Sequence, residues 1–162
     1  MSSLNNDRPH VLVLPEDDAN RQIATGFLLD PSLKLRNIRV LTPSGGWGKV
    51  LDNFVNDHIT GLRKYPHRHL VLLIDFDDRV DARHAQFLTH FPDDVRDRIF
   101  LLGTSSEPEP LRKKCGVSLE VIGKKLAAEC YRDETNLWAH ELLAHNEPER
   151  QRLNAKVKFI LF

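Results

Sequence analysis

Short apolar runs alternate with longer amphipathic segments along this chain, and this alternation constrains its fold more than any other feature. Four short runs, partly β-branched, predict strands buried on both faces. They cover residues 10–14, 37–41, 70–74 and 99–102. Between and after these runs, apolar residues recur at helical spacing. Helices are therefore expected at residues 20–29, 50–62, 82–89, 118–127, 137–143 and 149–160.

Repeated strand–helix–strand units favour a parallel sheet, because each crossover helix returns the chain to the same end of the sheet. We therefore expect a three-layer α/β fold, with a mostly parallel four-stranded sheet and helices on both of its faces. The chain has 162 residues, which is an ordinary size for one domain. The core is expected over residues 10–105, followed by a helical C-terminal extension over residues 106–162.

Charge and composition narrow the class of protein. Lys plus Arg and Asp plus Glu number 23 each, and this balance argues against the large basic face of a non-specific nucleic-acid binder. An enzyme that contacts nucleic acid through one local patch is compatible with it. No apolar run approaches the roughly 20 residues of a membrane span, and the polar N-terminus lacks the apolar stretch of a signal peptide. A cytoplasmic location is therefore expected.

Acidic residues follow two of the predicted strands at the point where each strand ends. Glu16, Asp17 and Asp18 come after the first strand, and Asp75 and Asp77 come after the third. Parallel strands end on one edge of a sheet, and ligands bind in the crevice there, so these acids meet if the two strands are neighbours. Carboxylates that lie so close together raise each other's pKa unless a cation neutralises them. An oxygen-only cluster suits a hard cation, and the sequence therefore predicts Mg²⁺ or Mn²⁺.

Three of these acids, Glu16, Asp75 and Asp77, are the expected core of the site. Glutamate is a poor turn former, so its place at a strand end favours a ligand role. In extended backbone Asp75 and Asp77 point the same way, while Phe76 points to the other side and packs. Asp18 is an expected auxiliary ligand, and its alternative role is that of a turn former or helix cap.

A Glu after the first strand, with an Asp-x-Asp after the third, resembles the Toprim fold. Topoisomerases, bacterial primases, small ribonucleases and the overcoming-lysogenization-defect (OLD) nucleases share that fold. The matching segments are 14–18 and 73–77, and the resemblance covers about residues 10–105. One departure is Asp17, which stands where many Toprim domains have glycine.

The resemblance implies metal-dependent phosphoryl transfer on nucleic acid, DNA or RNA. It assigns Glu16 the role of general acid or base, and it assigns Mg²⁺ binding to Asp75 and Asp77. No topoisomerase tyrosine module, primase zinc ribbon or ATPase module accompanies these residues in the sequence.

Two loops at the same edge of the sheet are candidates for substrate contacts. The first contains Gly45, Gly46 and Lys49, whose backbone amides and ammonium group suit a phosphate. This loop resembles the glycine-bearing turn of many Toprim domains, and its spacing is not that of a Walker motif. A plain flexible loop is the alternative. In the second loop Glu107 is expected to join the site, the alternative being an ordinary turn that leads into a helix.

Three functions compete on this evidence, and the metal-dependent nuclease is preferred. The second is a phospho-receiver-like signalling module, with acids at Asp17 and Asp18, a phosphorylated Asp75, and Thr104 after the fourth strand. A receiver also needs a lysine after a fifth strand, where this sequence predicts helix. The third is a non-catalytic Toprim-like subunit that serves a larger partner, such as the ATPase of OLD-type systems.

Overall fold

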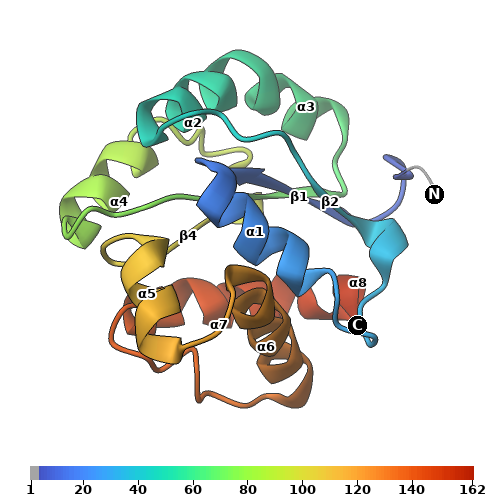
Figure 1. Ribbon diagram of the computed structural model, residues 1–162. Helices are drawn as coiled ribbons and strands as arrows, with labels where there is room; N and C mark the ends of the chain where they lie inside the picture. Colours follow the sequence, from blue (N-terminus) through green and yellow to red (C-terminus); the bar gives the residue numbers. More distant parts are fainter. Residues whose placement is uncertain (1–3) are drawn as a thin grey trace.

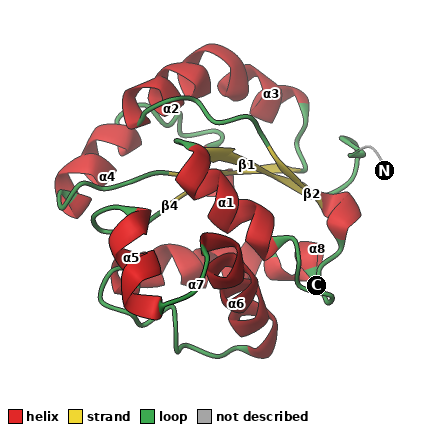
Figure 2. Cartoon of the chain, viewed as in Figure 1, coloured by secondary structure: helices red, strands yellow, loops and turns green. Residues whose placement is uncertain are grey.

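Four parallel strands form the centre of the fold (Figures 1 and 2), as seen in a computed structural model that describes residues 4–162. They are β1 (His10–Pro15), β2 (Ile38–Val40), β3 (Arg68–Leu73) and β4 (Ile99–Leu102). Their order in the sheet is β2-β1-β3-β4. β1 and β3 pair along their whole length, so the first and third strands are neighbours.

Helices account for most of the remaining chain. They are α1 (Asp18–Phe27), α2 (Trp47–Asn53), α3 (Ile59–Lys64), α4 (Val80–Leu88), α5 (Pro108–Cys115), α6 (Leu119–Arg132), α7 (Glu147–Lys156) and α8 (Lys158–Leu161). A π-helical turn, Phe54–His58, joins α2 to α3, so the helix predicted over this region is interrupted rather than regular. Within residues 4–162, no helix combines the length and the apolar character that crossing a membrane requires.

Alternate residues of the central strands pack on opposite faces of the sheet, as the pleat requires. Leu12 and Leu72 belong to an apolar cluster with residues of α2, α3 and α4. Val11 and Val13 belong to a second cluster with residues of α1, α7 and α8. Figure 1 shows α2 and α3 above the sheet, α4 to the left, and the C-terminal helices below the sheet. The predicted three-layer α/β fold with a parallel four-stranded sheet is therefore confirmed.

α1 and α6 cross with their backbones in direct contact. A Cβ atom on Gly26 would lie 2.0 Å from the carbonyl oxygen of Glu120, and one on Gly123 would lie 1.9 Å from the carbonyl oxygen of Ile23. No side chain other than the hydrogen of glycine fits either position. This contact ties α1, which begins at the carboxyl end of β1, to the C-terminal part of the chain.

Two predictions for the C-terminal part are wrong. The predicted helix over residues 137–143 is a series of turns, in which the Leu142 N–H bonds to His140 Nδ1 at 3.1 Å instead of to the carbonyl four residues earlier. The carboxylate of Glu129 accepts hydrogen bonds from the backbone N–H groups of Leu137 and Trp138, at the start of this segment, at 2.9 and 3.3 Å. The predicted final helix breaks at Val157, whose φ of −121° lies outside the helical range.

Side chains cover the free edge of β4, where a fifth strand would otherwise pair. The donors and acceptors come from α7 and the turn before it. The Leu101 N–H donates to Glu149 (2.8 Å), the Gly103 N–H donates to Asn146 Oδ1 (3.1 Å), Asn146 Nδ2 donates to the Gly103 carbonyl (2.9 Å), and Arg152 Nη1 donates to the Ile99 carbonyl (3.2 Å). Within residues 4–162 the sheet therefore ends at β4 on this side.

Candidate metal centre

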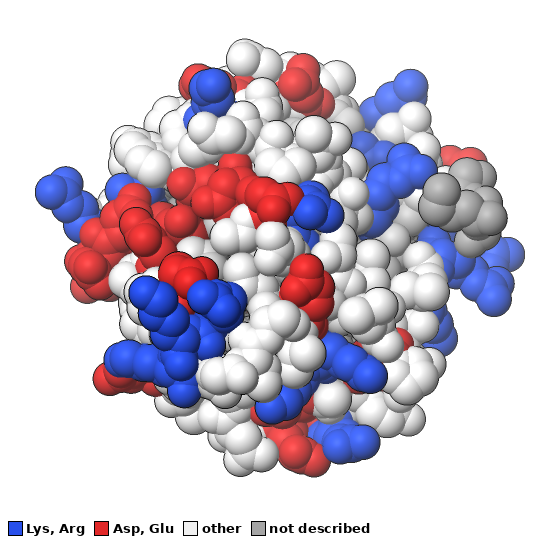
Figure 3. Space-filling view, viewed as in Figure 1, with Lys and Arg blue, Asp and Glu red and all other residues white. Residues whose placement is uncertain are grey.

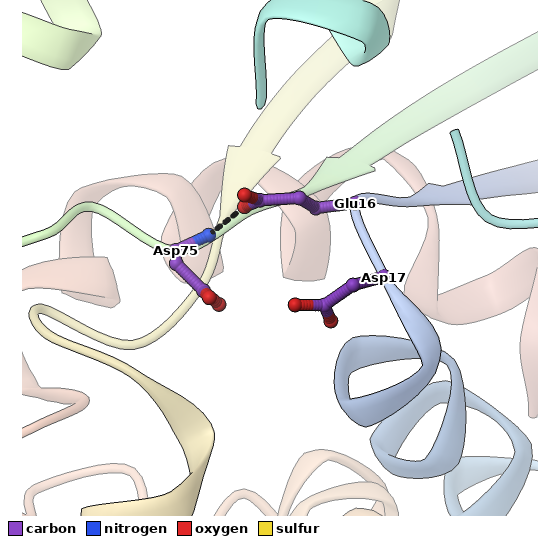
Figure 4. A group of neighbouring side chains, drawn as sticks. All are labelled: Glu16, Asp17 and Asp75. Carbon is purple, nitrogen blue, oxygen red and sulfur yellow. Dashed lines mark hydrogen bonds between the residues drawn. The ribbon is translucent and has the colours of Figure 1, made fainter. Parts of the chain in front are cut away.

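Three carboxylates meet where the strand order changes direction. β2 lies on one side of β1 and β3 on the other, and in parallel sheets the crevice at such a point is the usual place for a ligand. Glu16 and Asp17 follow β1, and Asp75 follows β3. One carboxylate oxygen from each lies within 4.8 Å of the others. Figure 4 shows Asp17 and Asp75 pointing toward one another, with Glu16 beside them. We call these three residues the acidic triad.

Glu16 is held at both its side chain and its backbone. Its Oε2 accepts a 2.5 Å hydrogen bond from the Asp75 N–H, and the Trp47 N–H also stabilises the carboxylate. Its carbonyl oxygen accepts hydrogen bonds from the N–H groups of Gly45 and Gly46, at 2.7 and 3.2 Å. Burial raises the pKa of Glu16 above its usual value, and the N–H groups of Asp75 and Trp47 oppose this rise.

The glycine loop therefore holds Glu16 instead of presenting free amides. The N–H groups of Gly45 and Gly46, expected to contact a phosphate, are bonded to protein. The φ angles of these residues, 98° and 143°, explain why glycines stand here. Lys49 lies exposed on α2. Of the three residues expected to contact a phosphate, it is the one whose donor group, the ammonium, remains suited to binding an anion.

Asn20 links the two aspartates of the triad through its side-chain amide. It is fully buried, and its Nδ2 donates to Asp17 Oδ1 at 2.9 Å and to Asp75 Oδ1 at 2.8 Å. The two carboxylates fix which way the amide faces, since the opposite orientation would turn its oxygen toward them. Asp17 also caps α1 by accepting from the Asn20 N–H at 2.9 Å.

Asp75 is the most strongly perturbed acid of the triad. Burial raises the pKa of Asp75 to about 7, and the negative charges of Glu16, Asp17 and Asp77 add to this effect. The hydrogen bond from Asn20 opposes it. A carboxyl group with such a pKa is half protonated near neutral pH, and a nearby cation would favour its ionised form.

Asp77 lies next to the triad rather than within it. The expectation that it points the same way as Asp75 fails, because its φ of 50° is left-handed and not extended. Its side chain is partly exposed, and its Oδ2 lies 3.5 Å from Nη1 of the buried Arg83. The guanidinium of Arg83 stacks 3.9 Å above the ring of Trp47. Phe76 is buried, as expected.

Asp18 and Glu107 lie outside the triad. Asp18 is the first residue of α1, its side chain is 63% exposed, and it pairs with Arg21 at 2.6 Å. These contacts with Arg21 and Gln22 lower the pKa of Asp18. Glu107 is exposed at the N-terminus of α5.

Two residues of this centre were not among the core ligands expected from the sequence. Asp17 was expected only as one of the wider group of acids at this edge, and no role was expected for Asn20. Asp17 and Asn20 at a three-residue spacing are typical of an ordinary helix N-terminus. Nothing in the sequence indicates that the amide of Asn20 also reaches Asp75.

The donor set fits a hard divalent cation. All three triad ligands are carboxylate oxygens, which Mg²⁺ and Mn²⁺ prefer. Oxygens on opposite sides of Mg²⁺ lie about 4.2 Å apart, given bonds of about 2.1 Å, and the triad oxygens lie within 4.8 Å of one another. Comparisons of this chain with models of protein families, with curated proteins and with solved structures found no match.

Proposed function

We propose that this protein binds Mg²⁺ or Mn²⁺ at the acidic triad and catalyses phosphoryl transfer on nucleic acid, as a nuclease of the Toprim type. One observation carries the proposal: the carboxylates of Glu16, Asp17 and Asp75 converge within 4.8 Å at the ends of β1 and β3, and two of them are buried. Burying like charges together is unfavourable unless a cation or protons neutralise them.

The contacts of each side chain support a division of roles. Bound divalent cations would supply positive charge to the phosphate oxygens and lower the pKa of an attacking water. Asn20 holds Asp17 and Asp75 in place through one Nδ2 group, so their remaining oxygens are available as ligands. Glu16, fixed by the Asp75 N–H and carrying a raised pKa, suits the transfer of a proton to or from an oxygen of the substrate.

Asp77 and Arg83 would border the reacting phosphate. The left-handed backbone at Asp77 costs some free energy, and strained residues cluster at functional sites. Arg83 is a buried cation that touches Asp77 and also donates to the Asp75 carbonyl at 3.4 Å. A phosphate near the triad would compete with Asp77 for this guanidinium, which binds both groups well.

The basic side chains of α5 are the surface feature that favours a polyanionic substrate on this side. Figure 3 shows acidic side chains gathered across the face that Figure 1 presents, with basic side chains beside them over α5. The last turn of α5 carries Arg112, Lys113 and Lys114. Arg112 pairs with Glu109 and Lys114 with Glu141, and such exposed pairs exchange partners at little cost. We propose that α5 contacts the phosphate backbone of the nucleic acid.

The test measures metal binding and cleavage in parallel on the purified protein. Calorimetric titration with Mn²⁺ should give saturable binding, and incubation with Mn²⁺ or Mg²⁺ should cleave single- or double-stranded DNA or RNA. Asp75→Asn should abolish both signals. Asp78→Asn is the matched control, since Asp78 is exposed in the same loop and lies outside the triad.

Two results would contradict the proposal in different ways. Binding of Mn²⁺ without cleavage of any nucleic acid would remove the catalytic part and favour a non-catalytic subunit, of the kind that serves an ATPase partner. No saturable Mn²⁺ binding would refute the metal centre itself.

A phospho-receiver-like module is the second candidate, because the order β2-β1-β3-β4 is that of the first four strands of the receiver fold. Asp17, Asp75 and the buried Thr104 also occupy the strand ends that such a module uses. Against it, side chains of α7 cover the β4 edge where a fifth strand and its lysine would lie. Incubation with acetyl phosphate and Mg²⁺ tests it: a receiver would gain a phosphoryl group on Asp75, detected by mass spectrometry.

A further inference from the structure

A partly open cavity of about 120 Å³ lies between the sheet and the C-terminal helices. Its walls are mainly apolar and come from β1 and β3, from α1, and from α6, α7 and α8. Representative lining residues are Val13, Ala24, Val71, Leu126, Leu153 and Val157. The carboxylates of the acidic triad do not line it, but it adjoins the proposed metal centre through Asn20, which lines the cavity and bonds Asp17 and Asp75.

Two buried polar side chains also line this cavity, and each has an atom without a hydrogen-bond partner. They are Asn20, which is 0% exposed, and Thr104, which is 1% exposed. The atoms without a partner among residues 4–162 are Asn20 Oδ1 and Thr104 Oγ1. By contrast, Asn146 lines the same cavity with both ends of its amide bonded to Gly103. Buried polar atoms are nearly always paired, so two open ones in one cavity indicate a missing partner.

The orientation of Asn20 cannot be reversed to remove this mismatch. Its Nδ2 is committed to the carboxylates of Asp17 and Asp75, so its Oδ1 has to find a donor elsewhere. The hydroxyl of Thr104 can both donate and accept. The partner of these two atoms would therefore be a group that can donate to an amide oxygen and accept from a hydroxyl.

We propose that this cavity binds a small apolar molecule, about the size of one benzene ring, that carries a single hydroxyl group. Its size follows from the volume, since an apolar cavity of about 150 Å³ takes up benzene. Its apolar body would fill the space between Val13, Ala24 and Val71, and its hydroxyl would pair with Asn20 Oδ1 or Thr104 Oγ1. Water could satisfy the polar atoms but would leave the apolar walls poorly hydrated.

Phenol and toluene are suitable probes, because they have nearly the same shape and differ by a hydroxyl group. The thermal unfolding midpoint and calorimetric binding of the full chain should be measured with each compound, in EDTA. Phenol should raise the midpoint in a saturable way and bind about tenfold more tightly than toluene, the worth of one ordinary hydrogen bond.

Two kinds of variant locate the binding. Thr104→Val keeps the shape of the side chain and removes the open hydroxyl, so it should fold with an equal or higher midpoint and reduce the preference for phenol. Ala24→Leu should fill the cavity and abolish binding of both compounds. If Ala24→Leu fails to fold, as judged by circular dichroism, Val71→Phe fills the same space from the sheet.

Three outcomes would overturn the proposal. The first is that neither compound binds the wild-type protein. The second is that a folded, filled variant binds phenol as well as the wild type does, which would place the compound elsewhere. The third is that Thr104→Val lowers the midpoint and phenol has no effect, which would mean that water alone occupies the polar end.

Discussion

Replacing Asp75 with asparagine should stabilise the metal-free protein at alkaline pH. Burial raises the pKa of Asp75 from 3.8 to about 7, so between these values the native state binds a proton that the unfolded state has lost. Stability attributable to this group therefore falls as the pH rises from about 4 to about 7 and is lost above that range. At about 1.4 kcal/mol per pKa unit, the loss at pH 8 is about 4 kcal/mol. Asparagine keeps the shape and the Oδ1 acceptor for Asn20 without the charge.

Urea or thermal unfolding in EDTA at pH 4.5 and pH 8 measures the effect. Relative to wild type, Asp75→Asn should gain about 2–4 kcal/mol at pH 8, or about 5–15 °C in a chain of this size, and no more than about 1 kcal/mol at pH 4.5. Asp52→Asn, at an exposed aspartate of α2, is the control and should show no such pH dependence.

Adding Mn²⁺ at pH 8 should make the wild type more stable than Asp75→Asn, because ligand binding stabilises only the protein that binds the ligand. Equal effects of Asp75→Asn at pH 4.5 and pH 8 would refute the reasoning, since they would mean that ionised Asp75 costs the native state nothing.

Four further predictions concern other parts of the molecule. Gly123→Ala should lower the free energy of unfolding by more than about 3 kcal/mol or prevent folding, since its Cβ would lie 1.9 Å from a backbone oxygen. Gly48→Ala, where a Cβ meets open space in α2, is the control and should raise the free energy of unfolding by about 0.5–1 kcal/mol in the same urea titration. Glu129→Gln should destabilise by about 1–3 kcal/mol in urea, because it weakens charge-assisted bonds to backbone N–H groups. Burial lowers the pKa of His145, so stability should fall as the pH drops below 6.5, and His145→Leu should flatten that part of the stability–pH curve. Asp18→Asn should leave Mn²⁺ affinity within about twofold by calorimetry, because this acid is exposed and paired outside the triad.

The strands were predictable from the sequence for a physical reason, whereas the pairing of the first strand with the third was not. Strands buried on both faces have to be continuously apolar, and such runs are visible without any knowledge of contacts. Glu16 and Asp75 could then be placed at one edge, because the parallel arrangement puts every strand's carboxyl end there. The rule that strand ends share an edge predicts which residues lie near one another, but it does not predict which way their side chains point.

Directions at the site depend on local backbone angles that the sequence does not reveal. Asp77 adopts a left-handed conformation and turns toward Arg83 instead of continuing the alternation from Asp75. Asp17 turns inward because it caps α1, and Asn20 reaches Asp75 across 55 residues of chain. These contacts follow from the position of α1 against the sheet, and that position depends on the close crossing of α1 with α6.

Local side-chain contacts also override the helical spacing of residues 137–143. The Leu142 N–H, which a helix would donate to the carbonyl of residue 138, is bonded to His140 Nδ1 instead. α5 was not predicted, because only Pro108 and Leu111 of its residues are buried and two buried residues make too short a periodic pattern.

The covered edge of β4 limits how a second protein can attach to this one. An open strand edge is a template for strand addition, in recognition and in aggregation alike. Here the side chains of Asn146, Glu149 and Arg152 already bind the backbone groups that an added strand would need. The opposite edge belongs to β2, which is three residues long and offers little length for pairing. A partner would therefore have to recognise helices and loops, and the fold resists edge-to-edge assembly by means of three side chains rather than an additional strand.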